Sequence, residues 1–235
     1  MHILLGSGGF RTPERIHLLT ATMRSYFGSI RKLLFIPYAL QDYDKYVMTV
    51  LQRGLDAGYE IDGIHNHADP LRAIWEAEGI FVGGGNTFRL LKTLYDLQLM
   101  DLLRSKVKGG LPYLGVSAGC NLACPTIRTT NDMPIVEPPT LNALNLVPFQ
   151  VNPHYVPGTM YYQDVAGNFV PYYGETREDR LREFHEENYT PVIGLWEGGI
   201  LEFKSGTLKV LGTPARLMKR GQTAVDYPAG SQIPL

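Results

Sequence analysis

Short apolar runs alternate with segments of helical periodicity through the first half of the chain. In one such segment Tyr43, Tyr46, Val47 and Val50 stand at positions i, i+3, i+4 and i+7, which is typical of an amphipathic helix. Other helices are predicted from Thr12-Pro13, from Asp69-Pro70, within the long apolar-periodic segment 88–107, and over 118–123 and 175–187. The apolar runs between them predict strands at 2–6, 32–38, 61–65, 79–83 and 112–116.

Repeated strand–helix units of this length predict an α/β fold, with a mostly parallel sheet and helices on both faces. In such sheets ligands bind beyond the carboxyl ends of the strands. Three glycine-rich breaks fall at those ends, at residues 6–9, 83–85 and 115–119. The sequence therefore predicts a ligand-binding site at this edge of the sheet.

The second half is less regular. Residues 125–140 hold four prolines and are expected to form a long loop, and residues 155–174, rich in tyrosine, a second exposed loop. Strands are expected at 147–151 and 192–195, with a C-terminal hairpin of 200–204 and 207–211. Without an internal repeat or a linker, residues 1–235 are expected to form a single domain.

The charge is nearly balanced, with 22 Lys and Arg against 23 Asp and Glu and a net charge of -1. This balance gives no reason to expect a nucleic acid or a membrane surface as a partner. The start MHILLGSGGF lacks the basic region and the apolar length of a signal peptide. Two cysteines, Cys120 and Cys124, form neither a disulfide framework nor a metal site, so we expect a cytoplasmic protein without a metal.

The sharpest candidate for chemistry is Gly115-Val116-Ser117-Ala118-Gly119, which fits the G-x-S-x-G pattern of a nucleophile elbow. The alternative is an ordinary strand-to-helix turn. At an elbow the Ser117 hydroxyl projects above the sheet, and the Ala118 N–H can face an oxyanion. Of the six histidines, His154 in VNPHY follows a strand at the same edge and is the best candidate base.

A third group must orient that imidazole. Asp132 in TTNDMP and Glu197 in GLWEGG are both suitable, and we favour Glu197 because its strand runs directly into glycines. Asp132, in a long loop, is suited to contact a substrate amino group instead. Arg128 and Arg177 are surface charges or partners for a substrate carboxylate, and Arg177 is the better of the two.

The segment Gly83-Gly84-Gly85-Asn86-Thr87 also allows two interpretations. It is either a strand-to-helix turn with Asn86 as N-cap, or a backbone cradle for a carbonyl oxygen that becomes negative. It lacks the lysine of a P-loop and the spacing of a dinucleotide fingerprint.

Together these segments resemble the aspartyl dipeptidases known as peptidase E. The resemblance covers roughly residues 30 to 200. It is carried by LLFIPYA (33–39), FVGGGNTFRLLK (81–92), GVSAGCNLACPTIRTTNDMPIV (115–136), VNPHY (151–155), GETRE (174–178) and VIGLWEG (192–198).

The resemblance implies a flavodoxin-like fold and hydrolysis of small peptides with an amino-terminal aspartate, without metal or cofactor. It implies Ser117 as nucleophile, His154 as base and either Asp132 or Glu197 as the third member. The family's oxyanion hole corresponds to the N–H groups of Gly85 and Ala118, and its aspartyl-binding positions to Asn86, Thr87, Asn131 and Arg177. Two departures bear on specificity, namely the Gly-Ser-Gly-Gly turn after the first strand and the long tyrosine-rich loop 155–174.

Other functions remain open from the sequence. One is a cyanophycinase-like peptidase acting on β-aspartyl-arginine polymers, and another is a non-catalytic small-molecule-binding module. A glutamine amidotransferase is disfavoured because the elbow carries Ser117 and the nearest thiol, Cys120, lies past Gly119. The expected oligomeric state is a monomer or a small homo-oligomer.

Overall fold

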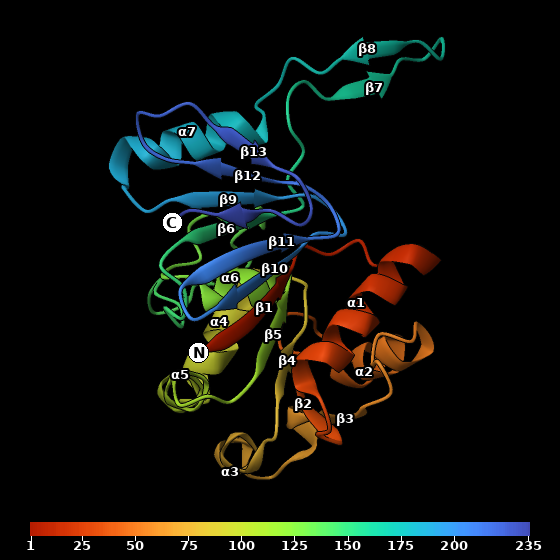
Figure 1. Cartoon of the computed structure of the whole chain (residues 1–235), viewed down its shortest axis with the longest axis vertical. Coiled ribbons are helices and arrows are strands. Elements are labelled where there is room, and N and C mark those ends of the chain that lie inside the picture. The colour runs from red at the N-terminus through yellow and green to blue at the C-terminus, as the bar shows by residue number, and fades with distance from the viewer.

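A sheet of eight strands forms the centre of the protein in the computed structural model, which describes residues 1–235 (Figure 1). Five strands run parallel, and three more are added at one edge through antiparallel pairings, so the α/β prediction is confirmed. The strand order is β14 (Gln232–Ile233), β11 (Thr207–Leu211), β10 (Ile200–Lys204), β1 (His2–Gly6), β5 (Tyr113–Val116), β4 (Ile80–Val82), β2 (Lys32–Ile36) and β3 (Glu60–Gly63).

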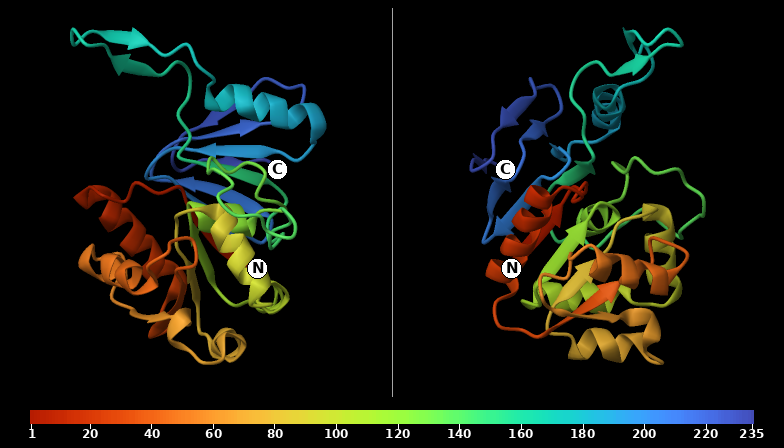
Figure 2. Two further views of the ribbon diagram at one scale, coloured as in Figure 1. Left: turned by 180° about the vertical axis from the view of Figure 1, so that it is seen from behind. Right: turned by 90° about the vertical axis from the view of Figure 1, so that its right-hand side faces the viewer.

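Alternate residues of the central strands face opposite layers of helices. Ile3 and Leu5 of β1 belong to one apolar cluster, whereas Leu4 belongs to a second cluster on the other face. Helices therefore cover both faces of the sheet (Figure 2). They are α1 (Pro13–Phe27), α2 (Tyr43–Gln52), α3 (Pro70–Glu76), α4 (Thr87–Asp96), α5 (Met100–Lys108) and α6 (Ala118–Ala123), with a 3-10 turn η1 (Ile64–Asn66) after β3.

A second sheet of four strands lies beside the β10–β11 edge of the first (Figure 1). Its strands are β13 (Val225–Tyr227), β12 (Ala215–Met218), β9 (Val192–Leu195) and β6 (Gln150–Pro153), and α7 (Arg177–Glu187) packs on it. Strands β6 and β9 are parallel, with Pro153 opposite Leu195. This register brings the residues that follow the two strands to the same end of the sheet.

The structure divides the long periodic segment 88–107 into two helices. Helix α4 ends at Asp96 and α5 begins at Met100, because Gln98 adopts a left-handed conformation (φ 56°) that turns the chain. Leu94 and Leu103 on either side are fully buried in one cluster. The apolar spacing continues across the break since both helices pack on the same core.

The expected loop 155–174 contains a β-hairpin, which corrects the sequence-based prediction. Strands β7 (Tyr161–Gln163) and β8 (Phe169–Pro171) pair and extend away from the body of the protein (Figure 1). Asp164 closes the turn between them by accepting hydrogen bonds from the N–H groups of Ala166 and Asn168. No helix of the chain combines the length and the apolar character needed to cross a membrane.

Candidate active site

Ser117 occupies a strained turn between β5 and α6, with φ 55° and ψ -109°. A Cβ atom on Gly115 would lie 2.3 Å from the Gly119 carbonyl oxygen, and one on Gly119 would lie 2.5 Å from the Val82 carbonyl oxygen. The two glycines of the G-x-S-x-G pattern are therefore required by close backbone packing. The Ser117 N–H donates to the Gly6 carbonyl at 2.9 Å, which ties this turn to the end of β1.

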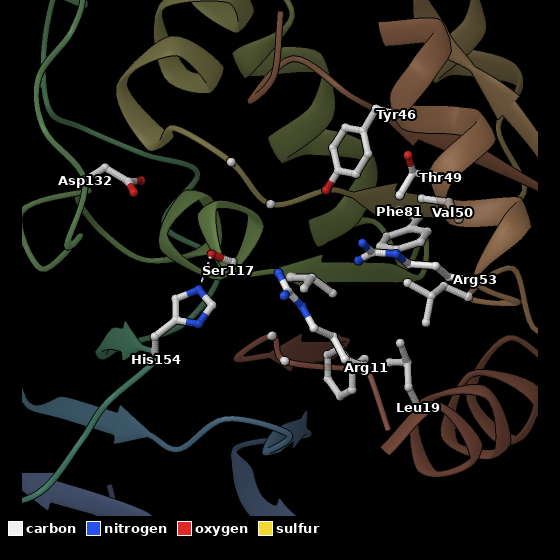
Figure 3. Close-up of a pocket in the computed structure, with 17 residues that line it drawn as sticks. Arg11, Leu19, Tyr46, Thr49, Val50, Arg53, Phe81, Ser117, Asp132 and His154 are labelled. Atoms are coloured by element: carbon white, nitrogen blue, oxygen red, sulfur yellow. Dashed lines mark hydrogen bonds between the residues drawn. The ribbon is translucent and has the colours of Figure 1, made fainter. Parts of the chain in front are cut away.

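Ser117, His154 and Glu197 form a continuous chain of hydrogen bonds. Ser117 Oγ lies 2.7 Å from His154 Nε2, and His154 Nδ1 lies 2.6 Å from Glu197 Oε1 (Figure 3 shows the first contact). Because Glu197 is a carboxylate acceptor, this geometry favours the tautomer in which Nδ1–H donates to Glu197 and Nε2 accepts from Ser117. Glu197 Oε2 is buried and accepts no hydrogen bond.

The turn after β1 holds the histidine in place. The buried Ser7 hydroxyl accepts from the His154 N–H at 2.8 Å and donates to the Leu195 carbonyl at 2.9 Å. It thereby connects the end of β1 in the first sheet with the ends of β6 and β9 in the second. Sequence reasoning missed Ser7, although a serine directly after a buried strand within glycines was the available signal.

The neighbouring glycines explain the unusual Gly-Ser-Gly-Gly turn. A Cβ atom on Gly8 would lie 2.5 Å from His154 Cε1, and one on Gly9 would lie 1.7 Å from Glu197 Oε2. The imidazole and the carboxylate therefore occupy the space that side chains at these positions would fill. The turn is thus fitted to the two side chains that it faces.

Asp132 forms no hydrogen bond with His154 and is anchored elsewhere. Its Oδ2 accepts from the Thr87 N–H at 2.8 Å, from the Thr87 hydroxyl at 2.5 Å and from the Thr130 hydroxyl at 3.0 Å. No protein donor reaches Oδ1. Asp132 lines the same cavity as Ser117 and His154 but on its opposite side from Arg53 (Figure 3).

The segment Gly83–Thr87 passes directly over Ser117. A Cβ atom on Gly84 would lie 2.9 Å from Ser117 Cβ, and the N–H of Gly85 has no acceptor within the protein. Asn86 caps α4, accepting from the Arg89 N–H at 3.0 Å, as one interpretation of the sequence predicted. The backbone of this segment is thus available beside the serine while the Asn86 side chain completes the helix end.

Two further candidate residues lie at a distance from the serine cavity. The Asn131 amide donates to the Pro153 carbonyl at 2.6 Å and accepts from Asn152 at 2.7 Å, so it supports the backbone that leads into His154. Arg177 is half-buried at the start of α7 and lines a different hollow. Burial and the Arg180 cation lower the pKa of Arg177, and the Asp132 carboxylate opposes that shift.

The two thiols are unsuited to act as nucleophiles. Cys120 and Cys124 are both fully buried and unpaired. Burial raises the pKa of the Cys120 thiol well above its ordinary value and that of Cys124 to about 12. Since the thiolate is the reactive form of cysteine, neither thiol is suited to be the nucleophile that a glutamine amidotransferase requires.

The cavity around Ser117 has a volume of about 410 Å³ and is lined on its far side by residues that sequence reasoning did not select. Arg11, from the turn before α1, and Arg53, directly after α2, project into it (Figure 3). Neither position belongs to a motif, so no pattern in the sequence marked them. No group of three or more His, Cys, Asp or Glu side chains is arranged to hold a metal ion.

A serine, a histidine and a glutamate in series beside a parallel α/β sheet are the arrangement of a serine hydrolase. The chain belongs to Peptidase family S51, whose sequence profile matches residues 2–211. It is 48% identical over 217 residues to Peptidase E of Streptomyces coelicolor, covering 90% of this chain and 84% of that one. It is 44% identical over 226 residues to Peptidase E of a Shewanella species (strain ANA-3), covering 94% and 92%.

Solved structures support the fold. A crystal structure of a peptidase from an acI-B1 Actinobacterium superposes with a TM-score of 0.68 at 18% identity, covering 100% of this chain and 96% of the other. That of a putative peptidase E protein from Listeria monocytogenes EGD-e gives 0.62 at 19% identity, covering 97% and 98%.

Proposed function

We propose that this protein is a serine dipeptidase that hydrolyses short peptides with an amino-terminal aspartate. The observation that carries the proposal is the hydrogen-bonded series from Ser117 Oγ through His154 to Glu197, with contacts of 2.7 and 2.6 Å. Serine is a weak nucleophile at neutral pH unless a base removes its proton as it attacks. His154 supplies that base, and Glu197 orients the ring and stabilises its cation.

We assign the scissile carbonyl oxygen to the space between the Gly85 and Ala118 N–H groups. Attack by Ser117 Oγ on the carbonyl carbon forms a tetrahedral intermediate, and the negative oxygen accepts from these two donors. In comparable sites each such donor lowers the activation free energy by on the order of 3 kcal/mol. His154 then protonates the leaving nitrogen, the peptide bond breaks, and water hydrolyses the acyl-enzyme by the same proton path in reverse.

The amino-terminal aspartate is assigned to the side of the cavity that holds Asp132. Asp132 Oδ1 has no protein donor, so it is free to accept from the substrate's α-ammonium group. Arg177, close enough to Asp132 for the two charges to interact, is the cation for the aspartyl carboxylate. Asn86 and Thr87 hold the backbone and Asp132 in position, and Asn131 supports the approach to His154.

Substrate comparison tests the proposal. We expect Asp-Leu to be cleaved far faster than Leu-Leu, Glu-Leu, Asn-Leu or β-Asp-Leu. Preference for β-Asp-Leu would instead support a cyanophycinase-like activity. Ser117→Ala and His154→Ala should each reduce kcat by about three orders of magnitude or more in a folded protein.

Labelling separates an enzyme from a binding module. A fluorophosphonate should modify the wild-type protein at Ser117 and leave folded Ser117→Ala unlabelled. Turnover of Asp-Leu by Ser117→Ala at the wild-type rate would contradict the serine mechanism.

Arg177 is tested separately from the reaction chemistry. Arg177→Met should lower kcat/KM for Asp-Leu by at least about tenfold and reduce the preference over Asn-Leu. Arg128→Met, which removes the same charge at an exposed position, tests the other candidate cation and should leave both measurements unchanged. If only Arg128→Met has these effects, Arg128 is the selecting cation.

We also propose where the enzyme acts and how it assembles. Two unpaired buried thiols are suited to the reducing cytoplasm, where we place the activity. The expected oligomeric state is a monomer or small homo-oligomer, to be measured by light scattering.

A further inference from the structure

The serine cavity continues past Ser117 on the side away from Asp132. Figure 3 shows Asp132 on one side of the serine, with Arg11 and Arg53 on the other. If the aspartyl residue of a peptide occupies the Asp132 side, its leaving residue must extend toward the arginines. The chemistry of this second half therefore decides which leaving residues the site accepts.

Two cations in this half have no partner. Arg11 and Arg53 form no ion pair and their guanidinium groups donate no hydrogen bond to the protein, whereas Arg72, Arg104 and Arg216 all pair with carboxylates. Asp132 is the only acidic residue that lines the cavity, and it lies on the other side of Ser117. The leaving-group half thus carries an uncompensated positive charge.

The walls around the arginines are largely apolar, although Tyr46 and Thr49 also line this half. The apolar side chains come from the turn after β1, from α1, from α2 and the turn that follows it, and from the sheet below. They are Phe10, Leu19, Val50, Leu55, Phe81 and Val116. An apolar side chain and a carboxylate on one small residue would match this surface, because the first gains by burial and the second by charge-assisted hydrogen bonds.

A dipeptide holds its terminal carboxylate close to the bond that is cleaved. Consecutive Cα atoms lie about 3.8 Å apart, so a dipeptide presents its terminal carboxylate within a few ångströms of the scissile nitrogen. In Figure 3 the Arg11 guanidinium lies between the Ser117–His154 pair and the guanidinium of Arg53, which comes from the far wall. A longer peptide would place a neutral amide where the dipeptide has its carboxylate.

We propose that Arg11, reinforced by Arg53, binds the free α-carboxylate of the leaving amino acid and so restricts the enzyme to dipeptides with an apolar second residue. This inference rests on the proposed function and adds a specificity site to it. Asp-Leu should be a better substrate than Asp-Leu-amide or Asp-Lys. The amide lacks the charge, and the lysine brings a second cation beside two arginines.

The test compares kcat/KM for Asp-Leu and Asp-Leu-amide. Wild-type protein should prefer the free acid by at least about tenfold, or about 1.4 kcal/mol. Arg11→Met should lower the rate for Asp-Leu by about tenfold while leaving Asp-Leu-amide within about twofold, so that the preference disappears. Arg53→Met should reduce the preference less, and Arg11→Lys should retain part of it.

A matched control separates the site from general electrostatics. Arg24→Met removes the same charge from an exposed position on α1 outside the cavity, and should leave both rates unchanged. Equal losses on both substrates in Arg11→Met would overturn the assignment of the carboxylate site.

The wild-type comparison alone keeps the inference testable even if a variant fails to fold. Equal cleavage of acid and amide overturns the inference and leaves the aspartyl dipeptidase function standing. Cleavage of neither overturns both.

Discussion

Replacing Gly9 by alanine tests whether the turn after β1 shapes the catalytic geometry. Gly9 has φ +67°, and a Cβ atom there would lie 1.7 Å from Glu197 Oε2 and 2.7 Å from Glu197 Cδ. The backbone of the turn is held by the Arg11 N–H on the Gly9 carbonyl and by the Gly198 N–H on the Gly8 carbonyl, both at 2.8 Å. We therefore expect the carboxylate, rather than the turn, to move.

The size of the displacement sets the expected loss. To reach ordinary van der Waals contact, the Glu197 oxygen must retreat by about 1.7 Å. A shift of that size strains or breaks the 2.6 Å contact between Glu197 and His154. Misplacement of a catalytic group by about 1 Å can cost 10²-fold, so we expect Gly9→Ala to lower kcat for Asp-Leu by at least about 10²-fold.

Gly221→Ala provides the matched control. Gly221 has φ +70°, close to that of Gly9, but a Cβ atom there meets nothing within 4 Å. Both variants bear the strain of alanine in a left-handed conformation, about 1 kcal/mol, which lowers Tm by about 2–4 °C in a protein of this size. Only Gly9→Ala should lose turnover. Folded Gly9→Ala with the kcat of Gly221→Ala would refute the reasoning.

Three further predictions concern neighbouring groups. Glu197→Gln should mainly lower kcat, because it removes the charge that stabilises the histidine cation, whereas Asp132→Asn should mainly raise KM in the same kinetics. Ser7→Ala deprives the His154 N–H of its acceptor, and should lower the free energy of unfolding by about 1–3 kcal/mol in denaturant titration, with kcat falling more than KM changes. Burial and the Arg220 cation lower the pKa of His185. The contribution of neutral His185 to the free energy of unfolding should therefore be fully present above about pH 6.5 and be lost as the pH falls toward the folded-state pKa. His185→Gln should flatten that part of a profile of Tm against pH.

Much of the first sheet could be predicted from local patterns. Its parallel strands are short apolar runs bounded by glycine, and its helices begin at residues such as Thr12 and Asp69, whose side chains accept from the N–H groups of the third residue on. Strands β12 and β13 escaped prediction because ARLM and VDY are short and carry charged residues. Their pairing is decided by neighbours distant in the chain.

Sequence patterns likewise predict some residues of the candidate site and not others. Ser117, His154 and Glu197 could be selected because each follows a strand at one edge. The choice between Asp132 and Glu197 as partner of His154 depended on register and loop geometry that no pattern contains. Arg11 shares no motif with Arg53, and only the packing of α1 and α2 above the sheet brings the two into one cavity.

The candidate site is divided between two sheets, so its geometry depends on how those sheets pack together. Ser117 follows a strand of the eight-stranded sheet, while His154 and Glu197 follow strands of the four-stranded one. The distance between His154 and Glu197 is set by the pairing of β6 with β9 within one sheet. The distance between Ser117 and His154 depends instead on how the two sheets pack against each other. Slippage by about one ångström at this seam would silence turnover while every strand stayed paired. Peptidase activity would therefore report how accurately the two sheets are positioned against each other. A sample with native secondary structure by circular dichroism could still be inactive.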